Sequence, residues 1–450
     1  MIRNLGEGLL LRRATPSDLD KLTAFNARVH SDAGWDVPDA GMAAWAGDLL
    51  SERHPTCAVD RFLIVEDREQ GAIASSSVLI PQTWSYAGTE FGVGRPELIG
   101  THPDYRHRGL VRVQLEVLHR WSLACGHRVQ AITGIPWYYR QFGYEMTVDM
   151  HGGRRGPVSA VPMLEDGQKE SFQIRAAAPT DLSFIAEVAA QGGERDLLNC
   201  VRDASLWRYE LDGQTSQSVN ARQLHIIEGP QGDRLGFLAH PGVRWGGGLH
   251  LTFYELRSGV SWWAVTPPVL RYLKRAGESL EPYGGAREGG PPFDALVLSL
   301  GREHPAYQVV EEWLPKVDKP YAWYLRVPDL PGYLRPIAGV LEQRLATSIL
   351  VGHTGTLRLD FYRDGVNLVF ERGRLVDVVP WTLGGEGDSE RKAGRAFMRF
   401  PDLTFLQVLF GYRSLDELAY AHADCGGNLE GRLLVKALFP KRPSTIWPIS

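Results

Sequence analysis

The residues best suited to chemistry lie in the segment 106–111, which reads RHRGLV. An apolar segment with Leu98 and Ile99 precedes it and predicts a strand, while the apolar residues after Gly109 recur at helical spacing. The first amides of a helix have no partner inside the helix, and the helix dipole is positive at this end. A strand that leads into such a turn can therefore bind a pyrophosphate, with the arginines adding charge. A solvent-exposed basic loop without a ligand is the alternative interpretation.

The following segments complete a crossover unit around this turn. Residues 129–132 predict a second strand, and the aromatic segment 137–144, WYYRQFGY, comes directly after it. A strand, a turn, a helix and a second strand place a ligand at the strand ends. The sequence therefore predicts that a phosphate-bearing ligand lies next to an aromatic wall.

Two motifs in this unit resemble those of the GCN5-related N-acetyltransferases (GNAT). HPDYRHRGLV is similar to motif A, since Arg106 and Gly109 match its Gln/Arg and Gly positions and Val111 stands where a small residue is usual. YYRQFGYE resembles motif B, about 30 residues further on. The resemblance implies that acetyl-CoA is bound by the strand and turn. The implied residues are Ile99, Gly100, Thr101, Arg106, His107, Arg108, Gly109, Leu110 and Val111.

The same resemblance implies the catalytic groups. Acetyl transfer to an amine needs a base for the amine and an acid for the leaving thiolate. In the family the tyrosine of motif B is the acid, which maps onto Tyr139, and the terminal carboxylate is the base, which would be that of Ser450. This chain ends in TIWPIS, whereas the aminoglycoside-modifying relatives end in an aromatic residue. Glu97 and His102 are the alternative bases.

The acceptor side of the cleft is expected in residues 31–41, an acidic and aromatic loop. The resemblance makes Asp32, Trp35 and Asp36 candidates to hold a cationic amine. An ordinary polar loop is the alternative. The expected reaction is transfer of the acetyl group of acetyl-CoA to a primary amine of a small molecule or a peptide.

An internal repeat begins near residue 174. LRRATPSDL, from Leu11, is echoed by IRAAAPTDL, from Ile174, and the match repeats a strand that leads into a capped helix. The second copy has no RxxGxG turn. It is therefore predicted to be a degenerate acetyltransferase-like domain. The residues that recur are Arg12, Ala14, Pro16, Asp18 and Leu19 as Arg175, Ala177, Pro179, Asp181 and Leu182.

A third part follows a proline-rich segment, residues 319–346, which is interpreted as a linker and a helix. Alternating residues in 356–362 and 365–371 predict a hairpin. This part resembles the sterol carrier protein-like domain that closes the enhanced intracellular survival family of acetyltransferases. The expected fold is α/β (α+β): a catalytic GNAT domain in 1–165, a degenerate GNAT-like domain in 166–325 and a sterol carrier protein-like domain in 326–450.

Composition restricts the remaining classes. The 450 residues are 44% hydrophobic and 23% charged, as in ordinary soluble proteins, and the net charge of -4 argues against a nucleic-acid binder. No apolar run approaches the ~20 residues of a membrane span, and no signal peptide is recognised, so a cytoplasmic protein without a membrane partner is expected. The four dispersed cysteines predict neither a metal site nor disulfides. The resembling family forms rings, which implies a homo-oligomer, possibly a hexamer. A non-catalytic CoA- or lipid-binding carrier is the competing function.

Overall fold

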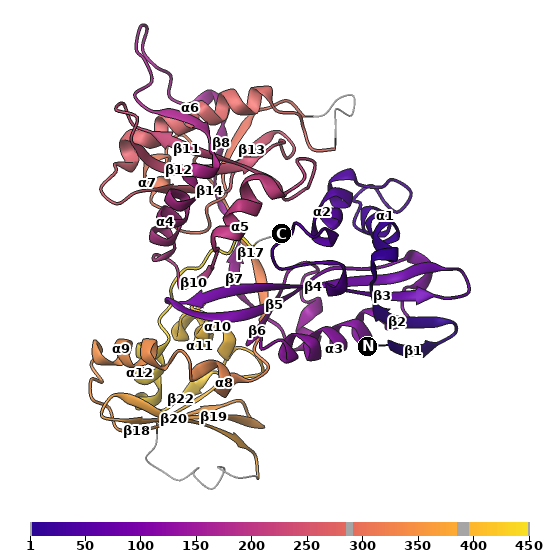
Figure 1. Ribbon diagram of the computed structural model, residues 1–450. Helices are drawn as coiled ribbons and strands as arrows, with labels where there is room; N and C mark the ends of the chain where they lie inside the picture. Colours follow the sequence, from indigo (N-terminus) through magenta and orange to yellow (C-terminus); the bar gives the residue numbers. More distant parts are fainter. Residues whose placement is uncertain (1, 285–290, 385–395, 449–450) are drawn as a thin grey trace.

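The computed structural model describes residues 2–284, 291–384 and 396–448, which form three lobes (Figure 1). The first lobe is built on a large sheet with α1 (Leu19–Val29) and α2 (Ala40–Leu50) on one face and α3 (Leu110–Ala124) on the other. Ile64 packs with α1 and α2, whereas its neighbours Leu63 and Val65 pack with α3, as alternation along a strand requires. The strand order is β1 (Ile2–Gly6), β2 (Leu9–Arg13), β3 (Phe62–Asp67), β4 (Ala72–Tyr86), β5 (Thr89–Thr101), β6 (Val129–Ile132), β17 (Tyr321–Arg326) and β7 (Glu145–Met150), with β10 (Leu198–Cys200) paired to β4.

The second lobe contains two four-stranded sheets and α4 (Leu182–Gly193), α5 (Ala204–Arg208), α6 (Trp262–Ser279) and α7 (Ala306–Val309). One sheet has the order β14 (Phe253–Leu256), β12 (Arg234–Pro241), β11 (Arg222–Glu228) and β9 (Gln173–Ala176). The other has the order β13 (Gly248–Leu251), β15 (Ala295–Leu298), β8 (Gly153–Pro157) and β16 (Lys316–Asp318).

The two lobes exchange one strand each. β8 comes from the end of the first lobe and lies between β15 and β16 of the second, while β17 follows the second lobe and lies between β6 and β7 of the first. The prediction that the proline-rich segment begins as a linker is therefore wrong for β17. Its residues 322–325 are buried, since β17 is an interior strand that pairs with β6 on one edge and with β7 on the other. A continuous apolar run is typical of a strand that is buried on both faces. β8 was expected in the domain 1–165 but pairs in the second lobe, and most of β17 was expected in the domain 166–325 but pairs in the first lobe.

The third lobe is a five-stranded sheet covered by short helices. Its strand order is β20 (Arg374–Thr382), β19 (Asp364–Glu371), β18 (Gly355–Asp360), β21 (Ala396–Arg399) and β22 (Gly426–Gly427). The predicted hairpin is confirmed as β18 and β19. The helices are α8 (Leu330–Leu334), α9 (Ala338–Ala346), α10 (Phe405–Leu409), α11 (Leu415–Ala421) and α12 (Leu429–Leu438).

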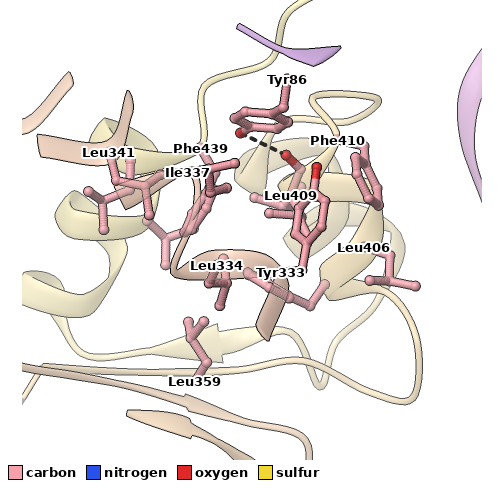
Figure 2. Close-up of a cluster of buried hydrophobic side chains, with 14 of the residues drawn as sticks. Tyr86, Tyr333, Leu334, Ile337, Leu341, Leu359, Leu406, Leu409, Phe410 and Phe439 are labelled. Atoms are coloured by element: carbon pink, nitrogen blue, oxygen red, sulfur yellow. Dashed lines mark hydrogen bonds between the residues drawn. The ribbon is translucent and has the colours of Figure 1, made fainter. Parts of the chain in front are cut away.

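The tip of the β4–β5 hairpin enters the core of the third lobe (Figure 2). The Tyr86 hydroxyl donates to the carbonyl oxygen of Leu409 at 3.0 Å and accepts from the Arg344 guanidinium at 2.9 Å. Its ring lies 6.3 Å from that of Tyr333. The first and third lobes therefore share one apolar core. Over the described ranges, no helix is both long and apolar enough to cross a membrane.

Candidate active site

The first sheet opens between β5 and β6. The two strands pair in parallel only at Val93–Val129 and Gly94–Gln130. Beyond this point β6 pairs with β17, while β5 continues to Thr101 beside β4. The strands therefore diverge, and a wedge forms in which main-chain groups of β5 have no partner on the β6 side.

A bulge in β5 lies along this wedge. Glu97 pairs with Val78 and Gly100 pairs with Ser76, so Leu98 and Ile99 both stand opposite one residue of β4. Leu98 has a φ of 47°, which an L-residue adopts at a cost. Bulges of this kind redirect a side chain or a peptide group at functional sites. Three of the predicted cofactor residues, Ile99, Gly100 and Thr101, lie in this part of β5.

The predicted pyrophosphate turn lies at the far end of β5. The helix begins at Leu110 with Gly109 as its N-cap, which confirms the predicted start. His107 and Gly109 have φ values of 63° and 73°, so successive amides turn toward the same side. The side chains of Arg106, His107 and Arg108 are exposed, and a Cβ on Gly109 would meet nothing within 4 Å. The turn thus has free space, free amides and positive charge, as an anion site needs.

A tyrosine and a carboxylate fix the base of this turn. The Tyr105 hydroxyl donates to Asp67 Oδ2 at 2.6 Å, which lowers the pKa of the Asp67 carboxyl and raises the pKa of Tyr105 to about 12. The Arg108 guanidinium lies 5.1 Å from the centre of the Tyr105 ring. The turn is therefore anchored to β3 through a side chain that the sequence did not single out.

Tyr139 is on the opposite side of the wedge, in a short 3-10 helix, residues 138–142. The side chain is only 6% exposed and packs against the rings of Tyr138, Tyr144 and Tyr324. Burial raises its pKa, and the nearby Glu97 carboxylate adds to this shift. Its hydroxyl makes no hydrogen bond with any described residue. Tyr139 is therefore a protonated donor at neutral pH, as an acid must be before it acts.

Glu97 is the carboxylate of β5 on this side. Its Oε2 lies 2.5 Å from Arg95 Nη2, and Oε1 accepts a hydrogen bond from the Leu98 N–H at 3.4 Å. The side chain keeps 15% of its surface exposed, whereas that of Arg95 keeps 5%. The Glu97 charge raises the pKa values of both Tyr139 and His30. Glu97 thus acts on both groups from the bulged strand.

His102, the other alternative base, has a different environment. Its ring lies 4.2 Å from that of Trp35 and 5.6 Å from that of Tyr105, and its Nδ1 accepts from the Asp104 N–H at 3.2 Å. These contacts join the end of β5 to the loop between α1 and α2. They give His102 a packing role beside the turn of residues 106–109.

The three candidate residues of the predicted acceptor loop have different environments. Trp35 packs on His102 and on Phe25 of α1, whereas Asp32 and Asp36 are exposed. The structure therefore places Trp35 against β5 and leaves the two aspartates at the surface of the loop.

Sequence reasoning missed Asp39 and its partner. Asp39 Oδ1 accepts from the Met42 N–H at 2.8 Å, which caps α2, and from the Tyr283 hydroxyl at 2.5 Å. Tyr283 comes from the second lobe and stacks on Trp245 with ring centres 4.1 Å apart. The cap was recognisable as an aspartate before an apolar helix, but no local signal indicated Tyr283.

The C-terminal segment runs between the lobes toward this region. The Leu197 N–H donates to the Pro443 carbonyl oxygen at 2.9 Å, and the Trp323 Nε1–H donates to that of Ile446 at 3.4 Å. The Arg222 guanidinium lies 5.0 Å from the centre of the Trp447 ring. Ser450, the implied base, lies outside the described residues.

The comparisons agree with this geometry. Residues 11–147 match the family model described as an acetyltransferase (GNAT) domain, a range that begins within β2 and ends in the middle of β7. This part of the chain is therefore similar to acyltransferases of the GNAT class. No curated protein sequence matches the chain. The described residues contain no group of three or more His, Cys, Asp or Glu side chains that could hold a metal ion.

Solved structures share the whole fold at low sequence identity. A GCN5-related N-acetyltransferase from Anabaena variabilis has a TM-score of 0.64 at 12% identity, covering 97% of this chain and 99% of its own. Eis1 from Mycobacterium abscessus has a TM-score of 0.58 at 12% identity, covering 97% and 98%. An N-myristoyltransferase from Saccharomyces cerevisiae with bound myristoylCoA has a TM-score of 0.50 at 12% identity, covering 72% and 84%. The chain thus has a mixed α/β fold with acyltransferases as structural neighbours.

Proposed function

We propose that this protein is an N-acetyltransferase that moves the acetyl group of acetyl-CoA directly to a primary amine. The observation that carries the proposal is the wedge between β5 and β6, which has an exposed turn with open space around Gly109 at one end and the Tyr139 side chain, only 6% exposed, at its side. The GNAT match over residues 11–147 and the myristoylCoA in a structural neighbour support a CoA thioester as donor.

The turn and the strand divide the work of binding. The amides of residues 108–111 and the side chain of Arg106 would hold the pyrophosphate, and the main chain of Ile99, Gly100 and Thr101 would bond the pantetheine arm. Peptide N–H groups at the bulge would stabilise the oxyanion that forms at the thioester carbon. Tyr139 would then protonate the leaving thiolate of CoA.

The acceptor would approach from the side of the α1–α2 loop. Asp32 and Asp36 are exposed carboxylates on this loop, and Trp35 offers an aromatic face. This combination suits a cationic amine, carried by a small molecule or a peptide. The carboxylates would raise the local concentration of such an acceptor rather than take part in the chemistry.

The carrier alternative needs an apolar cavity in the third lobe. The side chains of Leu334, Ile337, Leu341 and Leu359 are buried there and belong to one packed cluster (Figure 2). This packing favours the enzyme. We retain the sterol carrier protein-like assignment of this lobe and a ring-shaped homo-oligomer as proposals, the latter testable by light scattering at micromolar concentration.

A thiol-release assay tests the function. The protein is incubated with acetyl-CoA and a panel of polyamines, aminoglycosides and peptide amines, and free CoA is measured. We expect release that depends on one class of amine and tight binding of CoA by calorimetry. CoA binding without release for any amine would favour the carrier, and the absence of CoA binding would exclude both the enzyme and a CoA carrier.

A further inference from the structure

Tyr283 reaches from the second lobe to the first turn of α2, the helix that follows the predicted acceptor loop. Its hydroxyl donates to Asp39 Oδ1 at 2.5 Å, and its ring stacks on Trp245. This approach depends on a glycine, because a Cβ on Gly41 would lie 2.8 Å from Tyr283 Cε2 and closer still to the hydroxyl. The Gly41 carbonyl oxygen also accepts from the N–H of Val219, another residue of the second lobe, at 3.2 Å. The start of α2 is thus shaped to receive the second lobe.

A buried carboxylate makes the same contact at the other end of α2. Asp48 is 1% exposed and is the only charged residue of the helix, AGMAAWAGDLL. Its two oxygens accept from the Thr215 N–H at 2.9 Å and from the Thr215 hydroxyl at 2.6 Å, and the exposed Arg53 guanidinium lies 3.6 Å away. A buried carboxylate needs such partners, since burial without them is costly. The second lobe therefore holds α2 at both ends.

The acceptor loop is tied to the start of this helix. The Asp39 N–H donates to the Ala27 carbonyl oxygen of α1 at 2.8 Å, so residues 28–38 form a closed loop that contains the three candidate acceptor residues. Within it the Ser31 hydroxyl donates to the Val37 carbonyl oxygen at 2.5 Å. Because Asp39 both closes the loop and caps α2, a shift of Asp39 would move the loop as one unit.

We propose that Tyr283 positions the acceptor loop and thereby sets how tightly the first lobe binds its amine. The inference rests on the proposed acetyl transfer. Tyr283 acts through Asp39 and does not touch the reacting atoms, so it is a positioning residue. Without its hydroxyl the loop would adopt other positions, and the amine would bind only the fraction of molecules that has the loop in place. The second lobe thus takes part in acceptor recognition without a cofactor of its own.

Kinetics with matched variants test this role. Tyr283→Phe keeps the ring on Trp245 and removes only the hydroxyl. With the amine found in the thiol-release assay, we expect the KM for that amine to rise about tenfold, since a hydrogen bond to a carboxylate is among the stronger ones. The kcat and the KM for acetyl-CoA should stay unchanged. Tyr272→Phe removes a hydroxyl that lies 3.3 Å from His240 Nε2 within the second lobe, and it should change neither KM.

Two glycines of α2 give an independent comparison. Gly41→Ala should displace Tyr283 and raise the KM for the amine, as Tyr283→Phe does. A Cβ on Gly47 would meet nothing within 4 Å, so Gly47→Ala makes the same change in the same helix and should leave that KM unaltered. The three atoms nearest to a Cβ on Gly41 all belong to Tyr283. In a Tyr283→Ala background, Gly41→Ala should therefore have little further effect.

Two results would overturn the inference. One is a Tyr283→Phe enzyme whose KM for the amine is that of the wild type, or whose two KM values rise equally through general damage to the fold. The other comes from hydrogen exchange, which needs no turnover. The amides of residues 31–43 should exchange faster in Tyr283→Phe than in the wild type and in Tyr272→Phe, and equal rates in all three would refute the role of Tyr283. If no amine is acetylated, the proposed function fails, while the exchange rates still decide whether Tyr283 holds the loop.

Discussion

The first and second lobes begin with the same constellation of charged groups. Arg12 donates to both carboxylate oxygens of Asp18 at 2.7 and 2.8 Å, and Arg175 donates to both of Asp181 at 2.7 and 3.0 Å. Each aspartate also accepts from the main-chain N–H three residues before it, so each pair fixes the entry of its strand into a helix. The sequence repeat therefore encodes a repeated set of contacts.

The lobes differ where the strands diverge. In the second lobe the chain is interrupted at Thr252, so β13 pairs with β15 while β14 continues beside β12, as β5 does beside β4. By strand register, Glu255 of the second lobe corresponds to Gly100 of the first. On the helix that faces this strand, Gly192 corresponds to Val29, since each stands at the same distance in sequence from the arginine of its repeat. In the first lobe the strand carries the glycine and the helix the larger side chain, whereas in the second lobe the helix carries the glycine and the strand the larger side chain.

This exchange changes what the opening can hold. The first lobe offers main chain and an aliphatic side chain, whereas the second offers a carboxylate whose Oε1 lies 2.5 Å from Arg195. The helix starts differ too: the N-cap of α3 is Gly109, which has no side chain to accept a hydrogen bond, whereas in α6 the Ser261 Oγ accepts one from the Ala264 N–H at 3.3 Å. In the second lobe the Ala264 N–H, which a bound anion would need as a donor, is therefore already bonded to Ser261. Corresponding positions of the two lobes thus present different chemical groups.

The largest expected difference between the lobes concerns their tyrosines. Tyr139→Phe keeps the ring but removes the acid, and we expect kcat to fall ~100-fold with CoA affinity intact. Tyr307 follows the corresponding strand of the second lobe, where its hydroxyl donates to the Gly301 carbonyl oxygen at 2.8 Å and accepts from the Leu300 N–H at 3.0 Å. Tyr307→Phe should therefore lower the Tm but not kcat. An active Tyr139→Phe enzyme would remove that residue from the mechanism.

The helix starts give the next test. Gly109 and Gly259 both have positive φ, 73° and 84°, and open space around them, so a side chain is equally strained at either position. Gly109→Glu adds a repelling charge at the proposed pyrophosphate site, where each charge-assisted contact contributes ~1.5–3 kcal/mol. We expect the KM for acetyl-CoA to rise about tenfold to a hundredfold in this variant and to stay unchanged in Gly259→Glu. Equal effects of the two substitutions on KM would mean that backbone strain, not charge, was being measured.

The features that the sequence predicted correctly are local ones. The helix start at Gly109 and the repeat at Ile174 depend on residues a few positions apart, whose spacing decides which backbone groups meet. The second copy was recognisable because Arg175 and Asp181 must keep their spacing to bond each other. The strand, turn and helix around the candidate site followed from such patterns.

The features that the sequence did not predict depend on contacts between distant segments. The prolines of residues 319–346 are local signals and indicate a linker. The pairing of β17 with β6 and β7 joins segments that are far apart in the sequence, so no local signal indicates it. Tyr283 likewise meets Asp39 from another lobe. Long-range placement, not residue type, decided these cases.

The exchanged partners at the strand openings can be tested by coupling energies. A Cβ on Gly192 would lie 2.3 Å from Glu255 Cδ, and a Cβ on Gly100 would lie 2.6 Å from Val29 Cγ1. Gly192→Ala should lower the free energy of unfolding by ~1–3 kcal/mol through overcrowding, and much less in a Glu255→Ala background. Gly100→Ala should behave the same way toward Val29→Ala. Urea denaturation of each double-mutant cycle gives the coupling, and additive effects in one cycle but not in the other would show that the two pairs are not equivalent.

The smallest expected difference is between the two charged constellations. The paired arginines lower the pKa values of Asp18 and Asp181 from 3.8 to about 2. A lowered carboxyl pKa stabilises the fold fully above the unfolded value, and this contribution is lost as pH falls through the folded one. Asp18→Asn and Asp181→Asn should therefore each lower the free energy of unfolding by about 1 kcal/mol at neutral pH, the value of an ordinary net hydrogen bond, and by progressively less between pH 4 and pH 2. Urea titrations across this range would measure both losses. A loss in one lobe that persists at pH 2, or a cost many times greater in one lobe than in the other, would show that only one of the two constellations carries a stabilising ion pair and that the repeat is conserved in form alone.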